Sequence, residues 1–281
     1  MSLFITFLLR GRECILKELV LKFGDNFNEQ RVEKLQELRS KGVIVPLDDG
    51  VIISKDAKIG AGTVISAGCV IAEGCVIGEN CRLGYGSRLE RATLENGVIL
   101  HQCVNISSST VGGGCVLYAN SYLSGTTMGA NCEIKSCYIT DSIIGNAVSI
   151  GPFSHIRPNC TIADNVKIGD FVEVKNSRLG EAVHAAHLTY LGDIDCGARV
   201  NFGCGVAVAN FNGKEKFRTV IEDDVFVGCN TVLVSPVKLG SGAYTASGSV
   251  VTDDVPQDAV AIARARPVIK AGMAKKYRRK P

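Results

Sequence analysis

An aliphatic residue recurs at every sixth position between residues 51 and 83. The positions are Ile53, Ile59, Ile65, Ile71, Ile77 and Leu83. A small residue stands two positions before each of the last five, at Ala57, Thr63, Cys69, Cys75 and Cys81. Neither an α-helix nor an ordinary alternating strand produces this spacing. A repeat this short cannot bury its own apolar side chain, so successive copies must stack on one another. The sequence therefore predicts a solenoid of short parallel strands.

Pairs of an apolar residue followed by glycine continue the pattern toward the C-terminus, among them Val111-Gly112, Ile168-Gly169 and Leu239-Gly240. We expect these glycines to supply the positive φ that sharp corners often require. The pattern resembles the hexapeptide repeat of left-handed β-helix proteins, in which three short faces form one triangular coil. The resemblance implies an all-β fold, a left-handed parallel β-helix of about 11 coils over residues 49–258.

The flanking segments lack the repeat. Residues 1–48 show helical apolar spacing over 13–23 and 28–41, which predicts a short helical cap on the mouth of the tube. The repeat stops at residues 209–218, where Asn-Gly and two lysines predict a loop thrown out from the prism. A second break is expected at residues 184–188, and an irregular tail at 259–281.

Composition limits the location and the partners of the chain. Twelve cysteines suggest disulfides, but seven of them occupy the small inward position of the repeat, where Cys acts as a compact hydrophobe: Cys69, Cys75, Cys81, Cys115, Cys132, Cys137 and Cys160. Such thiols favour a reducing cytoplasm. A net charge of +3 gives no argument for nucleic acid or a membrane surface, and we expect neither a secretory signal nor a spanning segment.

Residues 150–267 carry motifs more specific than the repeat. They include IGPFSHIRP at 150–158, GDFVEVKNSRLGE at 169–181, HLTYLGD at 187–193, NFNGKEKFRT at 210–219 and AIARARPV at 261–268. In this order they closely resemble the acetyltransferase domain of the bacterial bifunctional UDP-N-acetylglucosamine pyrophosphorylase / glucosamine-1-phosphate N-acetyltransferase.

The resemblance implies transfer of acetyl from acetyl-CoA to glucosamine 1-phosphate or a related amino-sugar phosphate, without a metal. It also implies a homotrimer whose active sites lie between prisms. The bifunctional family begins with a large nucleotidyltransferase domain, for which residues 1–48 show no motif. We therefore expect acetyl transfer alone, with the uridylyl step left to another polypeptide.

His187 is the best candidate for a general base. Imidazole accepts a proton near neutral pH, and the residue matches the catalytic histidine of the family. The alternative is a hydrogen-bonded structural histidine. Glu173 matches the family's FVE-x-K-N element and is expected to orient His187 or offset its charge. Its alternative is a surface carboxylate paired with Lys175.

Four residues match family positions that hold the sugar phosphate: Arg157, Lys175, Tyr190 and Lys216. Their guanidinium, ammonium and phenol groups are suitable donors to phosphate oxygens. Arg157 and Lys216 are about three coils apart, so they can converge only across adjacent chains or through a reaching loop. For each cation alone, an exposed side chain without a ligand is the alternative.

Further positions follow from the resemblance. Asn201 and Asn210 match positions that contact the sugar. Four residues match positions that line the acetyl-CoA site: Cys204, Cys229, Ser247 and Arg264. Two thiols near a thioester raise the question of acyl capture, which the sequence does not favour because it shows no activating group beside them.

Two departures put the acceptor sugar in doubt. The family has Asn-Tyr followed by Asp-Gly on its loop, whereas this chain has Phe211 and Asn212 there. A phenol and a carboxylate that could bind a sugar hydroxyl are therefore missing.

Two other functions are weighed. The chain could be a non-catalytic paralogue that serves as an assembly or regulatory subunit, which the loop substitutions motivate. A zinc carbonic anhydrase of the same fold needs three histidines around the metal, and the chain has only His101, His155, His184 and His187, without suitable spacing.

Overall fold

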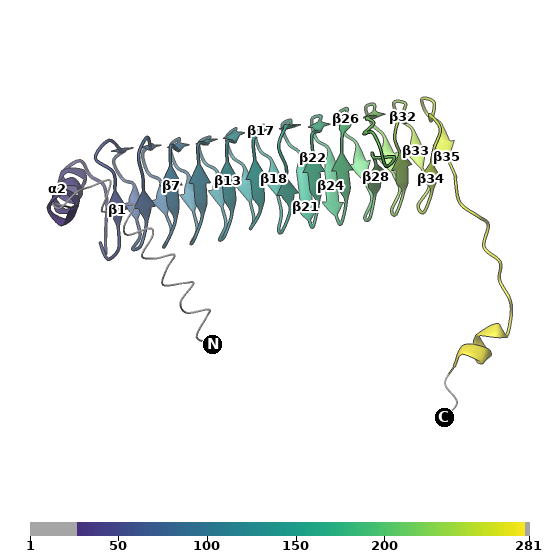
Figure 1. Ribbon diagram of the computed structural model, residues 1–281, viewed down its shortest axis with the longest axis horizontal. Coiled ribbons are helices and arrows are strands. Elements are labelled where there is room, and N and C mark those ends of the chain that lie inside the picture. Colours follow the sequence, from purple (N-terminus) through teal and green to yellow (C-terminus); the bar gives the residue numbers. More distant parts are fainter. Residues whose placement is uncertain (1–26, 279–281) are drawn as a thin grey trace.

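The chain winds into a three-sided parallel β-solenoid with one helix across its N-terminal end (Figure 1). The computed structural model describes residues 27–278. Within this range the strands form three sheets of 12, 11 and 12 strands, one on each side of the prism, and every strand-to-strand pairing in these sheets is parallel. The predicted solenoid fold is confirmed; the left-handed sense stays a prediction from the resemblance.

Sheet 1 contains every third strand, starting from the first. Its strands are β1 (Ile52–Ile53), β4 (Val70–Ile71), β7 (Arg88–Glu90), β10 (Asn105–Ser107), β13 (Tyr122–Ser124), β16 (Tyr138–Thr140), β19 (His155–Ile156), β22 (Glu173–Lys175), β25 (Tyr190–Gly192), β28 (Ala207–Ala209), β31 (Val232–Val234) and β34 (Val250–Val251).

Sheet 2 follows sheet 1 in each coil. Its strands are β2 (Lys58–Ile59), β5 (Val76–Ile77), β8 (Thr93–Leu94), β11 (Thr110–Val111), β14 (Thr127–Met128), β17 (Ser142–Ile144), β20 (Cys160–Ile162), β23 (Arg178–Leu179), β26 (Ile194–Cys196), β29 (Thr219–Ile221) and β32 (Lys238–Leu239).

Sheet 3 completes each coil. Its strands are β3 (Val64–Ile65), β6 (Arg82–Leu83), β9 (Ile99–Leu100), β12 (Val116–Leu117), β15 (Glu133–Ile134), β18 (Ser149–Ile150), β21 (Lys167–Asp170), β24 (His184–His187), β27 (Asn201–Phe202), β30 (Phe226–Val227), β33 (Tyr244–Thr245) and β35 (Val260–Ala261).

The described solenoid has about twelve coils, one more than the period predicted. Many coils are shorter than three full hexapeptides: Val70 pairs with Arg88, 18 residues on, but Arg88 pairs with Asn105, only 17 residues on (88 − 70; 105 − 88). Sheet 3 also continues to Ala261, past the predicted end at residue 258. The predicted break at 184–188 is wrong, since residues 184–187 form β24, which pairs with β21 and β27.

The apolar repeat lines the interior of the prism. The seven cysteines predicted to face inward are at most 3% exposed, and they are free thiols. Burial raises the pKa of both Cys69 and Cys137 to about 11. These thiols therefore act as packing groups rather than as nucleophiles.

The glycine of most apolar-Gly pairs has a different role from the one predicted, although Gly151, after Ile150, does have a positive φ of 105°. Gly112 and Gly169 do not have positive φ. A Cβ on Gly112 would lie 2.5 Å from the carbonyl carbon of Gly129 on the next coil, and one on Gly169 would lie 1.8 Å from the Ala186 oxygen. Glycine is needed there because the backbones of adjacent coils approach closely.

Helix α2 (Phe27–Ser40) confirms the second predicted helix, and the first lies outside the described residues. Leu35 and Leu38 of α2 are buried. Arg31 Nε donates to the Val51 carbonyl at 2.7 Å, so the helix is fixed to the first coil. No helix within residues 27–278 has the length and apolar character needed to cross a membrane.

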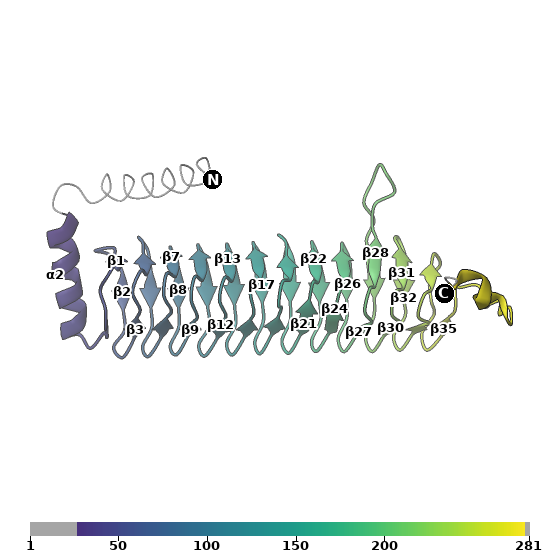
Figure 2. The same ribbon diagram turned by 90° about the horizontal axis from the view of Figure 1, so that it is seen from below.

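Two segments leave the prism. The chain between β28 and β29 projects from one side as a narrow loop (Figure 2), which confirms the predicted loop at 209–218. After β35 the chain runs away from the solenoid toward a short 3-10 helix, η1 (Met273–Tyr277) (Figure 1).

Candidate active site

The corner between sheets 3 and 1 stacks polar side chains from successive coils. Asp170 pairs with His187 in the β21–β24 ladder. Backbone hydrogen bonds continue the same register on the following coils. The N–H of Gly205 donates to the carbonyl of His187 at 3.4 Å, and the N–H of Asn230 donates to the carbonyl of Cys204 at 2.8 Å. We call the set the corner column: Asp170, His187, Cys204, Cys229 and Ser247.

His187 is exposed and held by a carboxylate. Its Nδ1 donates to Asp170 Oδ1 at 2.8 Å, and its side chain is 59% exposed. The hydrogen bond to His187 lowers the pKa of Asp170, so this carboxyl group stays ionised. A carboxylate at Nδ1 keeps the proton on that nitrogen and leaves Nε2 as the basic atom. The pair has the arrangement of an oriented general base.

Glu173 has a partner that the sequence analysis did not anticipate. Its Oε1 lies 2.8 Å from Arg157 Nη1 on the neighbouring coil, so its partner is neither His187 nor Lys175. Glu173 belongs to β22 of sheet 1, whereas Asp170 stands directly beside His187 in sheet 3. The sequence analysis missed Asp170; its spacing of one coil from His187 (187 − 170) was the available signal.

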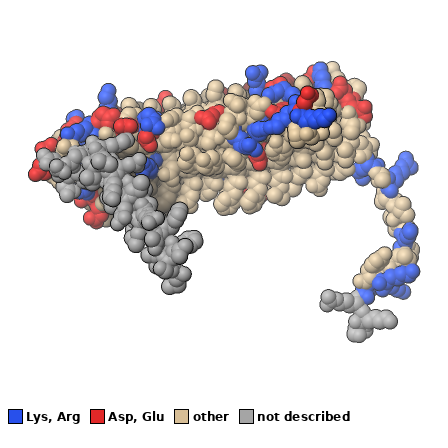
Figure 3. Space-filling model, in the orientation of Figure 1, with Lys and Arg blue, Asp and Glu red and all other residues tan. Residues whose placement is uncertain are grey.

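Three cations meet at the other edge of sheet 1. Lys216 on the protruding loop lies beside Lys175, and its amine lowers the pKa of Lys175; burial and the charge of Arg157 act in the same direction. The loop therefore brings these side chains together within one chain. The sequence analysis had allowed either this or convergence across adjacent chains. Figure 3 shows Lys and Arg atoms gathered along this part of the prism. Such a concentration of positive charge suits a phosphate.

Asp193 fixes the base of the protruding loop. It is only 6% exposed and accepts hydrogen bonds from the side-chain amides of Asn176 and Asn210. Burial raises the pKa of Asp193, but these donors, together with Lys175 and Lys216, outweigh it and hold the pKa below its usual value. Sequence reasoning missed this residue, although it ends the HLTYLGD motif.

A residue predicted to contact the sugar, Asn210, and one predicted to hold its phosphate, Tyr190, meet at this anchor. Asn210 Nδ2 also lies 3.5 Å from the Tyr190 hydroxyl. Asn201, by contrast, is in β27 and pairs with His184. It therefore lies on sheet 3, away from the loop.

The residues predicted to line the acetyl-CoA site lie on the coils that follow His187 in the sequence. Cys204 is half-buried, while Cys229 and Ser247 are exposed on the following coils of the corner column. Arg264 lies beyond them: its Cδ is 3.8 Å from where a Cβ on Gly248 would be. The four residues thus follow one corner of the prism from His187 toward its C-terminal end.

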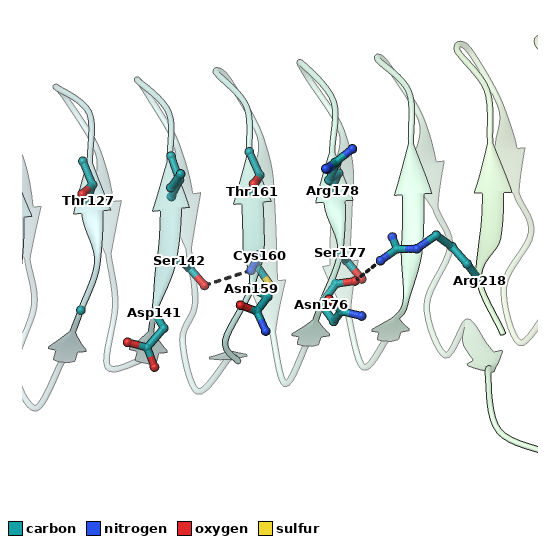
Figure 4. A pocket seen from close by; sticks show the side chains of 12 residues that line it. Thr127, Asp141, Ser142, Asn159, Cys160, Thr161, Asn176, Ser177, Arg178 and Arg218 are labelled. Atoms are coloured by element: carbon teal, nitrogen blue, oxygen red, sulfur yellow. Dashed lines mark hydrogen bonds between the residues drawn. The ribbon is translucent and has the colours of Figure 1, made fainter. Parts of the chain in front are cut away.

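A separate hollow of about 470 Å³ lies on sheet 2, along the coils that precede the loop in the sequence (Figure 4). Arg218 reaches into it and donates to the Asn176 carbonyl at 3.1 Å and to Asp195 Oδ1 at 2.9 Å. This arginine fixes the returning end of the loop. None of the residues proposed for acetyl transfer lines this hollow.

The described part of the chain contains no group of three or more His, Cys, Asp or Glu side chains arranged to hold a metal ion.

Comparison with known proteins agrees with the motifs. The family model described as "Bacterial transferase hexapeptide (six repeats)" matches residues 56–91, 141–176 and 218–253. Repeats of this kind are therefore recognised in three segments of the solenoid, 108 of the 281 residues (3 × 36).

The chain is also similar to proteins named "Bifunctional protein GlmU". It is 41% identical to the one from Halalkalibacterium halodurans over 226 residues, which is 80% of this chain and 42% of the relative. It is 42% identical to that of Exiguobacterium sp. over 179 residues, 64% of this chain and 40% of the relative. The resemblance seen in the motifs is confirmed, but the chain spans less than half the length of these curated relatives.

Among solved structures, a UDP-N-acetylglucosamine acyltransferase from Arabidopsis is 20% identical, with 73% of this chain and 69% of that chain covered. Its TM-score of 0.38 is too low to bear on function.

Proposed function

We propose that this chain is an acetyl-CoA-dependent N-acetyltransferase that acts on glucosamine 1-phosphate or a related amino-sugar phosphate. The observation that carries the proposal is the His187–Asp170 pair on sheet 3, at its corner with sheet 1, with the cluster of Arg157, Lys175 and Lys216 at the opposite edge of sheet 1. The similarity to GlmU proteins over most of the chain supports it.

His187 acts as the general base. Its Nε2 takes a proton from the ammonium of the sugar, and the free amine attacks the thioester carbonyl. The C–N bond forms, the tetrahedral intermediate loses the second proton of its nitrogen to solvent, the C–S bond breaks, and the imidazolium returns its proton to the departing thiolate. Asp170 keeps Nδ1 protonated and stabilises the imidazolium between these two steps.

The cations hold the phosphate of the acceptor. Two amines in contact, Lys175 and Lys216, repel each other, and a dianion between them relieves that repulsion. Tyr190 and Asn210 offer a hydroxyl and an amide for the sugar. Because Phe211 and Asn212 replace a phenol and a carboxylate, the acceptor is proposed as a class.

Acetyl-CoA lies along the part of the corner column that follows His187 in the sequence. Cys204, Cys229 and Ser247 line the thioester and pantetheine, and Arg264 pairs with phosphate oxygens of the coenzyme. Sheet 1 separates the imidazole from the cations within one prism. We therefore propose a homotrimer, in which a neighbouring prism closes each site. The abundance of free thiols supports a reducing, cytoplasmic location.

Release of free thiol from acetyl-CoA in the presence of glucosamine 1-phosphate tests the proposal. We expect His187→Gln to lower kcat by roughly 10²–10⁴-fold, the usual contribution of a general base. His184→Gln is the matched control, because His184 lies on the same strand and is also exposed. Equal activity in the two variants would rule out His187 as the base.

The non-catalytic reading rests on one specific observation, the loss of two polar groups at Phe211 and Asn212. It predicts no thiol release with any amino-sugar phosphate, even at saturating acetyl-CoA. Turnover with one acceptor of this class excludes it.

A further inference from the structure

We propose that the hollow on sheet 2 binds a hexosamine phosphate whose amine and phosphate lie on opposite sides of the sugar ring. This site is separate from the one proposed for acetyl transfer, because no residue assigned to that reaction lines the hollow. The proposal is carried by the charged and hydrogen-bonding groups that the hollow leaves without a partner.

The hollow has the size of a small-ligand site. Its volume is about 470 Å³, and such sites usually measure roughly 300–1,000 Å³. It extends over four coils between two rows of side chains (Figure 4). The corner between sheets 1 and 2 supplies Asp141 and Asn159, and the outward positions of sheet 2 supply Thr127, Thr161 and Arg178.

Arg178 contributes a positive charge that no described residue neutralises. Its neighbour in the β23–β26 ladder is Asp195, the obvious partner. The Asp195 carboxylate is instead bonded to Arg218, whose Nη1 donates to Oδ1 at 2.9 Å. Within residues 27–278 the Arg178 side chain therefore has no hydrogen bond or ion pair. Its guanidinium is free to bind two oxygens of a phosphate.

Asp141 contributes the opposite charge two coils away. Ile143, which follows it on the same coil, pairs with Thr161, and Thr161 pairs with Arg178. The backbones that carry the two charged side chains are therefore ~10 Å apart at the usual strand spacing. Among the described residues the Asp141 carboxylate has no hydrogen-bond or ion-pair partner. It is a suitable acceptor for an ammonium group.

The groups between the two charges suit a sugar ring. The Thr161 hydroxyl and the Asn159 amide line the hollow and have no side-chain partner in the described part of the chain. Such groups both donate and accept, as sugar hydroxyls require. Ile143, which is 58% exposed, offers an apolar surface to the C–H groups of the ring.

The separation of the charges selects among hexosamine phosphates. In glucosamine 6-phosphate the amine and the phosphate are attached on opposite sides of the ring. In glucosamine 1-phosphate they are attached to neighbouring carbons, so they span a shorter distance than the two coils between Asp141 and Arg178. We therefore expect the hollow to bind the 6-phosphate more tightly than the 1-phosphate.

Titration of the whole protein with glucosamine 6-phosphate tests the proposal, with NMR of ¹³C-labelled isoleucine methyl groups as the readout. The resonance of Ile143 is assigned by its loss in Ile143→Val. We expect a saturable shift of this resonance in the wild type. Arg178→Ala should weaken binding about 10-fold or more, because a charge-assisted contact is lost. Asp141→Asn should weaken binding of glucosamine 6-phosphate about 10-fold, and that of glucose 6-phosphate, which has no amine, much less.

Arg82→Ala is the matched control, because Arg82 is also an exposed arginine at an outward strand position, on sheet 3. It should keep the wild-type affinity. An Ile143 resonance that does not move at millimolar ligand overturns the proposal, and so does equal affinity in the wild type and Arg178→Ala. Tighter binding of the 1-phosphate at Ile143 overturns the class of ligand.

Thiol release from acetyl-CoA is measured separately on the same proteins. Arg178→Ala should keep the wild-type kcat, because Arg178 lies outside the machinery proposed for acetyl transfer. Thiol release without a shift of Ile143 overturns only the second site. A shift of Ile143 without thiol release from any amino-sugar phosphate supports the second site and overturns only the transferase proposal.

Discussion

A single buried carboxylate, that of Asp193, holds the base of the protruding loop. Its two oxygens are occupied by the amides of Asn176 and Asn210, which come from different coils. The amide of Asn210 is thereby fixed in orientation, with its oxygen left for another partner. A residue outside the proposed chemistry thus fixes the orientation of an amide that we propose binds the sugar.

Asp193→Asn should loosen the loop. An amide retains one acceptor oxygen, so one of the two donors loses its partner, at about 1–3 kcal/mol for a buried group. We expect faster hydrogen exchange in residues 210–217, with little change in the coils. Asp164→Asn is the control, because Asp164 is only half-buried and its carboxylate bonds only to Asn146. Unchanged exchange in Asp193→Asn would contradict the anchoring role.

The same carboxylate makes stability depend on pH. The pKa of Asp193 in the folded protein lies below its ordinary value of 3.8. Its stabilising effect is therefore complete above that value and is lost as the pH falls through the lower, folded-state pKa. Between pH 5 and pH 2.5, the wild type should lose more stability than Asp193→Asn in urea unfolding followed by circular dichroism. Parallel losses would show that another group is responsible.

At the scale of elements, the protruding loop places the positive charge of one lysine beside a lysine on another coil of the prism. Ala209 and Thr219 return to adjacent positions of the solenoid, and the loop between them places Lys216 beside Lys175. Loops on a rigid scaffold can vary in sequence without disturbing the coils that support them. This is consistent with the departures at Phe211 and Asn212.

Lys216→Ala should weaken binding of the acceptor phosphate. We expect KM for the amino-sugar phosphate to rise about 10-fold or more, and its dependence on salt to fall, because one charge-assisted contact is lost. KM for acetyl-CoA should change little. Lys214→Ala, on the same loop, is the matched control. Equal effects of the two substitutions would mean that the loop acts only through its net charge.

The close approach of adjacent coil backbones should make some glycines intolerant of any side chain. Gly112→Ala would place a Cβ 2.5 Å from the backbone of Gly129. We expect a loss of roughly 1–3 kcal/mol in the free energy of unfolding, as for other overpacked sites. Gly113→Ala, whose nearest contact would be 3.2 Å, should be milder. Denaturant midpoints compare the two; equal midpoints would contradict the explanation.

The whole molecule is a stack in which each coil contacts only its neighbours. Stability in such a fold is the sum of coil and interface terms, and damage stays local. Leu117, fully buried in a central coil, pairs with the coils of Leu100 and Ile134. Helix α2 covers the first coil, so the described end of the stack near the N-terminus is not an open sheet edge.

Leu117→Ala should cost about 2–5 kcal/mol. Hydrogen exchange should increase in β9, β12 and β15 and remain unchanged in the coils that carry His187 and Asp193. Val220→Ala, at an outward position of β29, is the control. A uniform increase across the prism would contradict this picture and indicate a single cooperative unit.

The sequence was sufficient to predict which side chains face the core. The six-residue period places Ile65 and Cys69 on the inner side whatever the exact length of the coil, because each face carries one inward position in every repeat. The loss of that period at residue 209 located the loop for the same reason. Helix α2 followed from its own apolar spacing.

Contacts between outward side chains were decided only by the tertiary structure. They depend on how many residues each coil contains, and this number varies: Tyr122 pairs with Tyr138 after 16 residues (138 − 122), whereas Val70 pairs with Arg88 after 18 (88 − 70). A shift of one residue moves an outward side chain beside a different neighbour. Asp170 meets His187 because it lies one coil away on sheet 3, whereas Glu173 lies on sheet 1, and the reach of Lys216 depends on the path of the loop rather than on spacing.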